Sequence, residues 1–548
     1  MSALGGLDWL VIGLYFFGIL VGVIWSSRKQ DSSEDYFLAG RNLGWFVIGA
    51  SLFASNIGSE HIVGLAGSGA KSGMAMAHYE LHAWCLLVLG WVLVPFYHNS
   101  KVFTMPEFLE RRYNSTTRWI LSLISLVAYV FTKVSVTVYA GGTVFQSLLP
   151  EISVGGLDAF WVGALAVVIL TGLYTIFGGL RAVVYTDALQ AVVLLIGSLC
   201  ITVIGLKTLG GWGELRALCG SQHFNMWRPA NDPEFPWVGM LIGAPITGLW
   251  YWGTDQYIVQ RTLAARNLQQ ARRGTIFGAF LKLTPVFLFI VPGMIAYALS
   301  KSGRLQLDNY DQAFPVLVKN LLPVGLRGLV VAGLLAALMS SLSSLFNSCS
   351  TLFTIDIYEK LRPGQSEKHL VFVGRVATTI VVVLGVIWIP VMRLVSGALY
   401  EYLQSVQAYL APPITAVFFL GVFSKRINAK GALVGLIVGF AFGMFKLACQ
   451  IFSGLESFAG SMPTFALALG QMNFLYFCIL LFVVSIVLIV GVSLMTAPPP
   501  AEKVESLTYS TLSDKVRKEF RSSWNRWDVI STVVILAIIL GVYIYFTG

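Results

Sequence analysis

The chain has 548 residues, of which 56% are hydrophobic and only 12% are charged. Soluble proteins carry about a quarter charged residues, so this composition excludes an ordinary soluble enzyme, a secreted disulfide scaffold and a disordered chain. The net charge of +10 does not indicate nucleic-acid binding, because Lys and Arg cluster in short segments between apolar runs and form no basic groove or helix. The length therefore fits one membrane-embedded domain over 1–548.

Apolar runs that are long enough to cross about 30 Å of hydrocarbon recur along the whole chain. They predict an all-α polytopic membrane protein with about 14 transmembrane helices. In chain order the runs cover 8–26, 44–70, 75–98, 117–148, 158–178, 182–207, 237–260, 274–300, 325–355, 369–392, 396–423, 430–451, 473–496 and 527–547.

Basic residues are distributed unevenly between the two sides of the predicted membrane. One set of alternating connections holds 25 Lys and Arg residues, and the other set holds 9. The positive-inside rule makes the richer set cytoplasmic, which places both termini outside and a mixed-charge linker at 497–526 inside. A sequon at Asn114 then lies inside. This sequon and the short external connections favour the plasma membrane of a bacterium, that is, its inner membrane.

Two of the predicted spans are interrupted by small and polar residues. The span 44–70 contains Ser55-Asn56-Ile57-Gly58-Ser59-Glu60-His61, and five spans later 237–260 contains Gly253-Thr254-Asp255-Gln256. Interrupted helices at matching places in two halves indicate an inverted-repeat transporter. We therefore predict a five-plus-five inverted-repeat core with broken first and sixth core helices. Its parts are an extra N-terminal helix at 8–26, a first repeat at 44–207, an inverted second repeat at 237–423 and peripheral helices at 430–547.

Ionisable residues inside the apolar runs are costly in a bilayer and therefore face a cavity, a partner or a pathway. They are His61, Glu80, Asp187, Asp255 and Lys282. Lys133 lies nearer the end of its run, where snorkelling to the interface would suffice. Glu80 with Lys282 would be neutral overall, and the pair either holds a neutral polar solute or only ties two helices together. Asp187 is either a cation ligand or the partner of a basic loop residue.

The run 325–355 carries an unusual density of polar side chains. Four of them share one helical face and a fifth lies beside it; the set is Ser340, Ser344, Asn347 and Ser348, with Ser341 beside them. Membrane serines usually bond to their own helix or pack against a neighbour. A hard cation prefers several oxygen ligands, which hydroxyls and the carbonyls of a broken helix supply. The combination favours a small-cation site.

Aromatic residues adjoin the second break at Trp250, Tyr251 and Trp252, and Gln404 with Gln407 interrupts a later run. Rings beside amide and carboxylate groups suit a sugar, whereas an interfacial aromatic belt is the alternative. Catalytic signatures are absent from the sequence: there is no nucleophile elbow, zinc motif or phosphate loop, and no Cys-x-x-Cys. We therefore expect neither an enzyme nor a structural metal site.

Six motifs, in order over essentially the whole chain, resemble the sodium:solute symporter family and within it the sodium/glucose cotransporter branch. They are Glu34-Asp35-Tyr36-Phe37-Leu38-Ala39-Gly40-Arg41, Ala54 to His61, Gly-Gly-Leu-Arg-Ala…Tyr-Thr-Asp ending at Asp187, Trp250 to Gln256 followed by Val259-Gln260-Arg261, Ala337-Leu338-Met339-Ser340-Ser341, and Tyr402-Leu403-Gln404-Ser405. The resemblance implies sodium-driven uptake of a neutral sugar by alternating access, for which a monomer suffices.

The resemblance also implies roles for individual residues. The main sodium site would comprise the carbonyls of Ala54, Ile57 and Ala337 with the hydroxyls of Ser340 and Ser341. A second sodium site would comprise Asp187, Ser340, Ser343 and Ser344. The sugar site would comprise Asn56, His61, Glu80, Trp252, Lys282 and Gln404. Tyr251 would form the inner gate, and Tyr79 and Tyr400 would cap the outer side.

Some positions depart from relatives or separate the branches of the family. The bacterial galactose transporter has glutamine where this chain has His61, and Gly248 replaces a polar side chain that reaches the sugar in relatives. The inositol-transporting branch shares the Gly-Ser-Glu-His motif but carries an aspartate in its serine stripe, which is absent here. A hexose of the glucose or galactose type is therefore favoured over myo-inositol, another polyol or mannose. A membrane sugar sensor without transport is the alternative of a different class.

Overall fold

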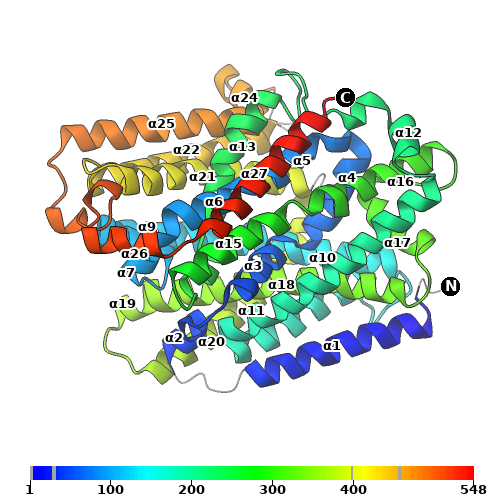
Figure 1. The fold of residues 1–548 in the computed structure, drawn as a ribbon, viewed down its shortest axis with the longest axis horizontal. Coiled ribbons are helices and arrows are strands. Elements are labelled where there is room, and N and C mark those ends of the chain that lie inside the picture. Colours follow the sequence, from blue (N-terminus) through cyan, green and yellow to red (C-terminus); the bar gives the residue numbers. More distant parts are fainter. Residues whose placement is uncertain (1–3, 27–31, 396–398, 454–459) are drawn as a thin grey trace.

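The computed structural model describes residues 4–26, 32–395, 399–453 and 460–548. Within them the fold is helical, and the only extended pairings are isolated bridges such as the one between Leu43 and Ala265. The long helices lie roughly side by side and run along the long axis of the molecule (Figure 1). α12 and α17 lie at one end of this axis, near the C-terminus and the start of α1, and α2 and α19 lie at the other.

The helices of the first half follow the predicted runs closely, with short helices in the connections. They are α1 (Gly6–Ser26), α2 (Ser33–Leu38), α3 (Trp45–Asn56), α4 (Ser59–Ser72), α5 (Ala77–Leu81), α6 (Trp84–Val88), α7 (Val94–Ser100), α8 (Met105–Arg112), α9 (Ser115–Ala128), α10 (Ser135–Leu148), α11 (Ala159–Leu209) and α12 (Trp212–Phe224).

The second half and the peripheral helices complete the bundle. They are α13 (Ala244–Gly253), α14 (Gln256–Leu263), α15 (Leu268–Lys282), α16 (Val291–Lys301), α17 (Ala313–Leu321), α18 (Leu326–Thr351), α19 (Glu359–Leu361), α20 (Glu367–Val395), α21 (Leu399–Phe423), α22 (Ala429–Ser453), α24 (Thr464–Gln471), α25 (Phe474–Met495), α26 (Asp514–Ser522) and α27 (Arg526–Tyr545).

The two predicted helix breaks are present. Ile57 and Gly58 separate α3 from α4, and Thr254 and Asp255 separate α13 from α14. In each half, the next two long helices each contain a π-helical turn. These turns are Leu89–Leu93 and Tyr129–Val134 in the first half, and Val286–Ile290 and Leu352–Tyr358 in the second. Because π turns are rare, their recurrence in the same helix order supports two related halves.

α11 contains two of the predicted runs, and a sharp kink at Gly179 separates them. Gly179 has a φ of 54°, and a Cβ atom there would lie 2.7 Å from the carbonyl oxygen of Tyr36. Glycine is required on both counts, because other residues disfavour this φ and no side chain fits. The kink lies where the sequence places a connection between 178 and 182.

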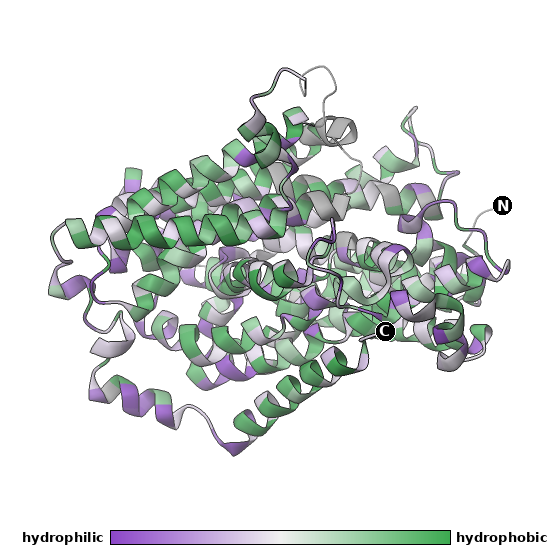
Figure 2. Ribbon diagram, turned by 90° about the horizontal axis from the view of Figure 1, so that it is seen from above, coloured by the Kyte–Doolittle hydropathy of each residue, from purple (hydrophilic) through white to green (hydrophobic). Residues whose placement is uncertain are grey.

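Ten helices of the described ranges are long and apolar enough to cross a membrane, and three shorter apolar helices accompany them. The exact count of 14 therefore remains a prediction. Figure 2 shows the long helices as predominantly hydrophobic, with much of the hydrophilic colour in the connecting segments. This distribution matches a bundle that is surrounded by lipid and has water at both ends.

Buried charged side chains fasten the ends of some helices. The carboxylate of Asp8 accepts hydrogen bonds from the backbone N–H groups of Gly325 and Gly328, at 2.6 and 2.8 Å, at the start of α18. The guanidinium of Arg112 donates to the carbonyls of Gly421, Ser424 and Ile427 at and after the end of α21. Each charge lies at the helix end of opposite polarity, where it satisfies backbone groups that the helix leaves unpaired.

Candidate functional site: a polar cavity between the two broken helices

A polar cavity lies between the two broken helices and α21. All six residues assigned to the sugar site by resemblance line it: Asn56, His61, Glu80, Trp252, Lys282 and Gln404. Two of the gate residues, Tyr79 and Tyr251, line it as well. The side chain of the third, Tyr400, lies outside the described part of the chain. Residues that are up to 348 positions apart in the sequence are thus brought to one place.

The cavity lies where helices end, because broken helices leave backbone groups and polar side chains inside the bundle. Asn56 is the last residue of α3, His61 is the third residue of α4 after the break, and Trp252 lies just before the break between α13 and α14. Lys282 is the last residue of α15, and Glu80 lies in the short helix α5. The two breaks therefore create the polar space that the apolar sequence otherwise excludes.

Glu80 and Lys282 form a buried ion pair across the cavity wall. The Lys282 Nζ atom lies 2.7 Å from Glu80 Oε2, and the two side chains are 5% and 0% exposed. The ammonium also lies 5.5 Å from the ring centroid of Trp252, close enough for a cation–π contact. The pair adds two charged hydrogen-bonding groups to the cavity while its net charge remains zero.

Several buried polar atoms at the cavity make no hydrogen bond to the described residues. They include Glu80 Oε1, Asn56 Nδ2 and His82 Nε2. Leaving such an atom unsatisfied costs about 1–3 kcal/mol, and native structures rarely tolerate it without a bound water or ligand. An acceptor such as Glu80 Oε1 and a donor such as Asn56 Nδ2 at one cavity are suited to a solute with several hydroxyl groups.

Lys133 corrects one expectation from the sequence. It does not snorkel to an interface but lies in the π turn Tyr129–Val134, is 8% exposed and lines the cavity. Its Nζ atom lies 2.5 Å from Asp255 Oδ2 at the second break. Four aromatic rings surround the ammonium at 4.7 to 5.0 Å, those of Tyr129, Trp250, Tyr251 and Tyr257. The aromatic cluster and the ion pair form the wall of the cavity beside the second break.

The serine face of α18 lies directly against the break in the first core helix. The hydroxyl of Ser341 donates to the carbonyl of Ser55 at 3.2 Å, and Ser55 Oγ lies 3.0 Å from Ser344 Oγ. Tyr257 of the second broken helix donates to the same Ser55 carbonyl. Ala54, Ile57 and Ala337 are buried in the same region. Oxygen atoms from both broken helices and from α18 thus converge at one buried point.

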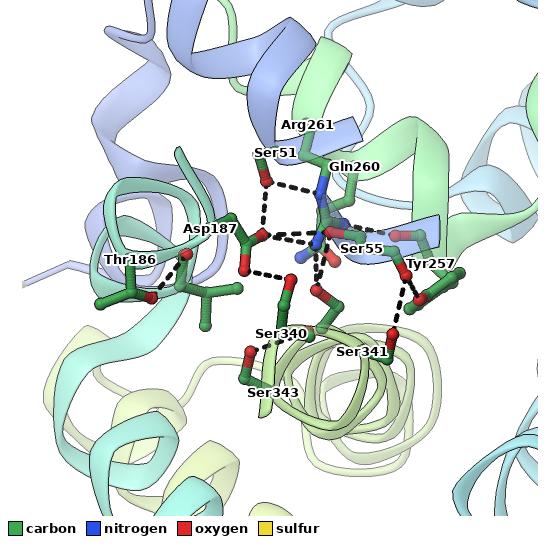
Figure 3. Close-up of polar contacts among 12 residues, drawn as sticks. Ser51, Ser55, Thr186, Asp187, Tyr257, Gln260, Arg261, Ser340, Ser341 and Ser343 are labelled. Carbon is green, nitrogen blue, oxygen red and sulfur yellow. Dashed lines mark hydrogen bonds and ion pairs between the residues drawn. The ribbon is translucent and has the colours of Figure 1, made fainter. Parts of the chain in front are cut away.

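Asp187 lies close to this point and is fully buried (Figure 3). Its carboxylate accepts hydrogen bonds from Ser51 at 2.6 Å, Ser55 at 3.1 Å and Ser340 at 2.7 Å. The guanidinium of Arg261 lies 3.5 Å from the same carboxylate. Of the other two residues assigned to the second sodium site, Ser344 accepts from Arg261, and Ser343 bonds back to the Ser340 carbonyl.

Arg261 is a site residue that reasoning from the sequence does not identify. The sequence places it among the basic residues of a cytoplasmic connection, whereas in the structure its side chain is 0% exposed. Its guanidinium donates to Ser51 at 2.9 Å, to the Tyr257 carbonyl and to Ser344 (Figure 3). One side chain thus joins α3, α14 and α18 around Asp187. Asp187 therefore has a basic partner, as one of the two alternatives from the sequence predicts. This partner is Arg261 of α14 and not a residue of a connection.

A second polar cavity adjoins the first and shares Tyr79 and Gln404 with it. Its other lining residues come from the end of α4, the connection before α13, and the turn at Tyr310–Gln312. An ion pair between Lys71 and Glu234, at 2.5 Å, lies at this cavity. The two cavities together lead from the breaks toward the end of the bundle where α4 ends.

Comparison with known proteins agrees with this architecture. The sequence model of the sodium:solute symporter family matches residues 36–439. Sodium/myo-inositol cotransporter 2 of Bos taurus is 41% identical, and the match covers 93% of this chain and 80% of the relative. Sodium/glucose cotransporter 4 of Danio rerio is 39% identical, with 94% and 83% covered. Sodium/glucose cotransporter 1 of Oryctolagus cuniculus is 40% identical, with 93% and 82% covered.

Among solved structures, a Na⁺-coupled sialic acid symporter in a substrate-bound outward-open state has a similar fold. The TM-score is 0.76 at 22% identity, and the superposition covers 90% of this chain and 99% of the symporter. The family match spans more than half of the chain, and the curated relatives match it nearly end to end. The chain therefore belongs to the sodium:solute symporter family, and it is a sodium-coupled membrane symporter rather than an enzyme.

Proposed function

We propose that the transported solute is a neutral hexose of the glucose or galactose type. The observation that carries this proposal is the Glu80–Lys282 pair, which presents a free carboxylate oxygen to the cavity without adding net charge. A neutral solute with several hydroxyl groups can bond to both partners, whereas a charged solute would have to face one of them unfavourably. Trp252 provides an apolar ring for the C–H face of a sugar.

The main sodium ion is assigned to the carbonyls of Ala54, Ile57 and Ala337 and to the hydroxyls of Ser340 and Ser341. Support comes from the direct contact of Ser341 with the broken helix at Ser55. A hard cation prefers several oxygen ligands, and uncharged ones bind it without the cost of a fixed buried charge. Sodium here would tie α18 to the first broken helix.

A second sodium ion is assigned to Asp187, Ser340, Ser343 and Ser344. The carboxylate and the hydroxyls are suitable ligands for sodium. In the conformation described, however, the cation that faces Asp187 is the guanidinium of Arg261. Sodium binding at this carboxylate would therefore require Arg261 to withdraw or to share it, which makes the number of sodium ions per cycle depend on this arginine.

The sides of the membrane and the gates follow from the same assignment. We infer that the end of the bundle at the second cavity is external, because the positive-inside rule places both termini there. Tyr79 and Tyr400 are the proposed outer gate, and Tyr251 is the proposed inner gate. Tyr251 packs against Trp252 and Tyr257, with ring centroids 5.0 and 6.0 Å apart. All these groups belong to one chain, so a monomer suffices.

The plasma membrane is the proposed location. Short external connections and a sequon on the internal side support a bacterial inner membrane, although the relatives named above are animal proteins. Sodium and sugar would be coupled through the broken helix, since sodium bound at the carbonyls of Ala54 and Ile57 would fix Asn56, which lines the sugar cavity. By linkage, each ligand raises the affinity for the other by the same factor.

Uptake of radiolabelled glucose and galactose into proteoliposomes tests this proposal. The purified protein is given an inward sodium gradient, and an equal potassium gradient is the control. Sodium-dependent accumulation of one hexose, inhibited by the other, is expected. Absence of uptake for both hexoses would overturn the proposal, and mannose and myo-inositol would be tested next.

Myo-inositol is the second candidate solute, because a relative with 41% identity is a sodium/myo-inositol cotransporter. It is also a neutral ring with hydroxyl groups, so the Glu80–Lys282 pair does not separate the two solutes. The serine face of α18 does favour the hexose, since it carries no acidic residue between Ser340 and Ser350. Competition between unlabelled myo-inositol and labelled glucose ranks the two directly. Sodium-dependent binding without accumulation of either would indicate a sensor.

A further inference from the structure

A broad, open apolar groove lies on the outside of the bundle, away from the sugar cavity. It runs between the end of α11, the start of α12, the π turn before α16 and the last helix, α27, and has a volume of about 550 Å³. Such a volume lies within the usual range for small-molecule sites. We call it the α27 groove; its lining residues are Thr202, Leu206, Trp212, Phe287, Val291, Ile538, Gly541, Val542, Tyr545 and Phe546.

The groove exists because polar contacts hold α27 near its two ends. Near its start, Asp528 pairs with Arg273 at 2.9 Å and Thr532 accepts from the indole of Trp91. Near its end, the Met226 N–H donates to the Phe546 carbonyl, and the Trp212 indole donates to the Tyr545 hydroxyl. Between these contacts, one face of the helix packs on the bundle through Ile535, Ile539 and Val542, and the adjacent face borders the groove.

Gly541 contributes no side chain to the groove. An added Cβ atom at this position would meet no atom within 4 Å, so the helix leaves open space there. The lining offers little to a polar ligand: the hydroxyl of Thr202 is already bonded to the carbonyls of Ser198 and Phe287. Neighbouring side chains such as Leu199 and Leu540 are more than half exposed, as expected for a surface that faces lipid. The groove therefore suits a long apolar chain.

The end of the groove carries positive charge. Lys207 follows the lining residue Leu206, Arg304 donates to the carbonyl of Thr208, and Arg216 lies 5.9 Å from the ring of Tyr545. Glu214 is the acidic residue of this region, so basic groups exceed acidic ones. At this level Trp212 is half-buried and Tyr545 is exposed, and such amphipathic rings are typical of the membrane interface. Phosphate is the lipid group that this arrangement of charge favours.

We propose that the α27 groove binds an anionic phospholipid of the leaflet at the α12 end of the bundle. One acyl chain would lie along the face of Ile538 and Gly541, and the phosphate would lie against Lys207 and Arg304. The apolar groove supplies the binding energy through burial of the chain, and the basic mouth selects the headgroup. The bound lipid would fill the space that α27 leaves open against α11.

Photolabelling in nanodiscs tests this site. The probe is phosphatidylglycerol with a diazirine at the end of one acyl chain, and labelled peptides are identified by mass spectrometry. Labelling concentrated on peptides that contain Trp212, Phe287 and Ile538 is expected. Gly541→Phe fills the groove and is expected to lower this labelling by about tenfold. Gly491→Phe is the matched control, because Gly491 on α25 is equally open.

A second variant does not depend on filling the groove. Lys207→Glu reverses one charge at the mouth and is expected to lower labelling by phosphatidylglycerol more than labelling by a phosphatidylcholine probe. Equal labelling of the groove and of α25 peptides would overturn the proposal, as would labelling that Gly541→Phe leaves unchanged. A crosslink between the groove and another protein chain would also overturn it. Retained sodium-dependent uptake verifies that each variant is folded.

Discussion

At the scale of single residues, the site relies on buried charges whose partners come from distant helices. Glu80 and Lys282 are 202 positions apart, and Asp187 and Arg261 are 74 positions apart. Burying two charges costs about as much as their attraction returns, so such pairs contribute little net stability. Their value is positional, because each pair fixes hydrogen-bonding groups at the cavity or beside the broken helices. Changes at these residues should therefore alter binding, and a change that leaves one charge of a pair without its partner should also lower stability.

Glu80→Gln tests the sugar contact directly. The amide oxygen can still accept from Lys282, but the charge that strengthens a bond to a sugar hydroxyl is lost. A charged hydrogen bond contributes about 1.5–3 kcal/mol, so the KM for sugar should rise about tenfold or more while maximal uptake at saturating sugar falls less. Glu34→Gln is the control, since Glu34 pairs with Arg41 far from the cavity and is 47% exposed. An unchanged KM in Glu80→Gln would remove this residue from the sugar site.

The Asp187–Arg261 pair is tested by a double-mutant cycle. Asp187→Asn leaves the Arg261 charge buried without its partner, and Arg261→Gln does the reverse, so each single change should destabilise the fold by about 3–5 kcal/mol. The double variant removes both charges and should be more stable than the sum of the two losses predicts, with a coupling of about 0.5–3 kcal/mol. Thermal unfolding in detergent measures all three variants. Strictly additive losses would show that the two charges do not interact.

At the scale of helices, function depends on where a helix stops. The breaks at Ile57–Gly58 and Thr254–Asp255 free backbone groups inside the bundle. The serine face of α18 contacts the first of these breaks. Intact helices satisfy nearly all of their own backbone groups and so offer few carbonyl oxygens to a cation. The polar face of α18 and the broken helices are therefore expected to bind sodium together. Changing either part should alter sodium dependence.

Ser341→Ala removes the hydroxyl that contacts the broken helix. The sodium concentration for half-maximal uptake should rise about tenfold, as expected for the loss of one cation ligand worth about 1.4 kcal/mol. Because bound sodium and bound sugar raise each other's affinity, the sugar affinity at a fixed low sodium concentration should also fall. Ser350→Ala is the matched control on the same helix, since its hydroxyl donates to the Gly374 carbonyl of α20 and belongs to neither proposed sodium site. Sodium activation curves compare the two variants, and identical curves would contradict the main-site assignment.

Asp8→Ala tests how α1 supports the core. The Asp8 carboxylate caps the start of α18 and also accepts from the Gly5 N–H at 2.8 Å. Loss of a cap costs about 0.5–2 kcal/mol, and the buried N–H groups of Gly325 and Gly328 would be left unsatisfied in addition. The unfolding temperature should fall, while the sodium activation curve of the remaining folded protein stays unchanged. Asp8→Asn should lose less, because its amide oxygen can still accept.

The sequence predicts the breaks and the cavity well but misses two of the buried cations. Ser55 to Gly58 interrupts an apolar run with small and polar residues, a local pattern that needs no knowledge of the fold. Arg261 has no such signal, because a basic residue just after an apolar run has the same local pattern whether it faces water or pairs with a buried acid. Lys133 lies at the middle of the run 117–148, which argues against snorkelling but does not identify its partner. Asp255 lies 122 positions from Lys133, so only the folded bundle shows that they meet.

At the scale of the whole molecule, the sugar cavity adjoins the second cavity at the end where α4 finishes, and the two share Tyr79 and Gln404 as lining residues. The Lys133–Asp255 pair and the aromatic cluster around it lie beside the second break on the same cavity. Tyr129 also donates a hydrogen bond to Asp255, so the π turn Tyr129–Val134 is joined to the second helix break at this wall of the cavity. Alternating access would require this wall to open while the other side closes, and sodium binding would bias that equilibrium.

Transport should therefore respond to membrane potential as well as to the sodium gradient. A neutral sugar carried with at least one sodium ion moves net positive charge inward. Each charge gains about 2.3 kcal/mol per 100 mV of inside-negative potential, which corresponds to an additional sugar accumulation of about 50-fold at equilibrium. Potassium-loaded proteoliposomes with valinomycin set the potential, and labelled glucose reports accumulation at constant sodium.

Two coupled sodium ions would square this factor, so the slope of accumulation against potential counts the charges. If Arg261 excludes a second sodium ion from Asp187, wild-type protein should give the slope for one charge. Accumulation that does not depend on potential would show that the cycle moves no net charge and would contradict sodium–sugar coupling.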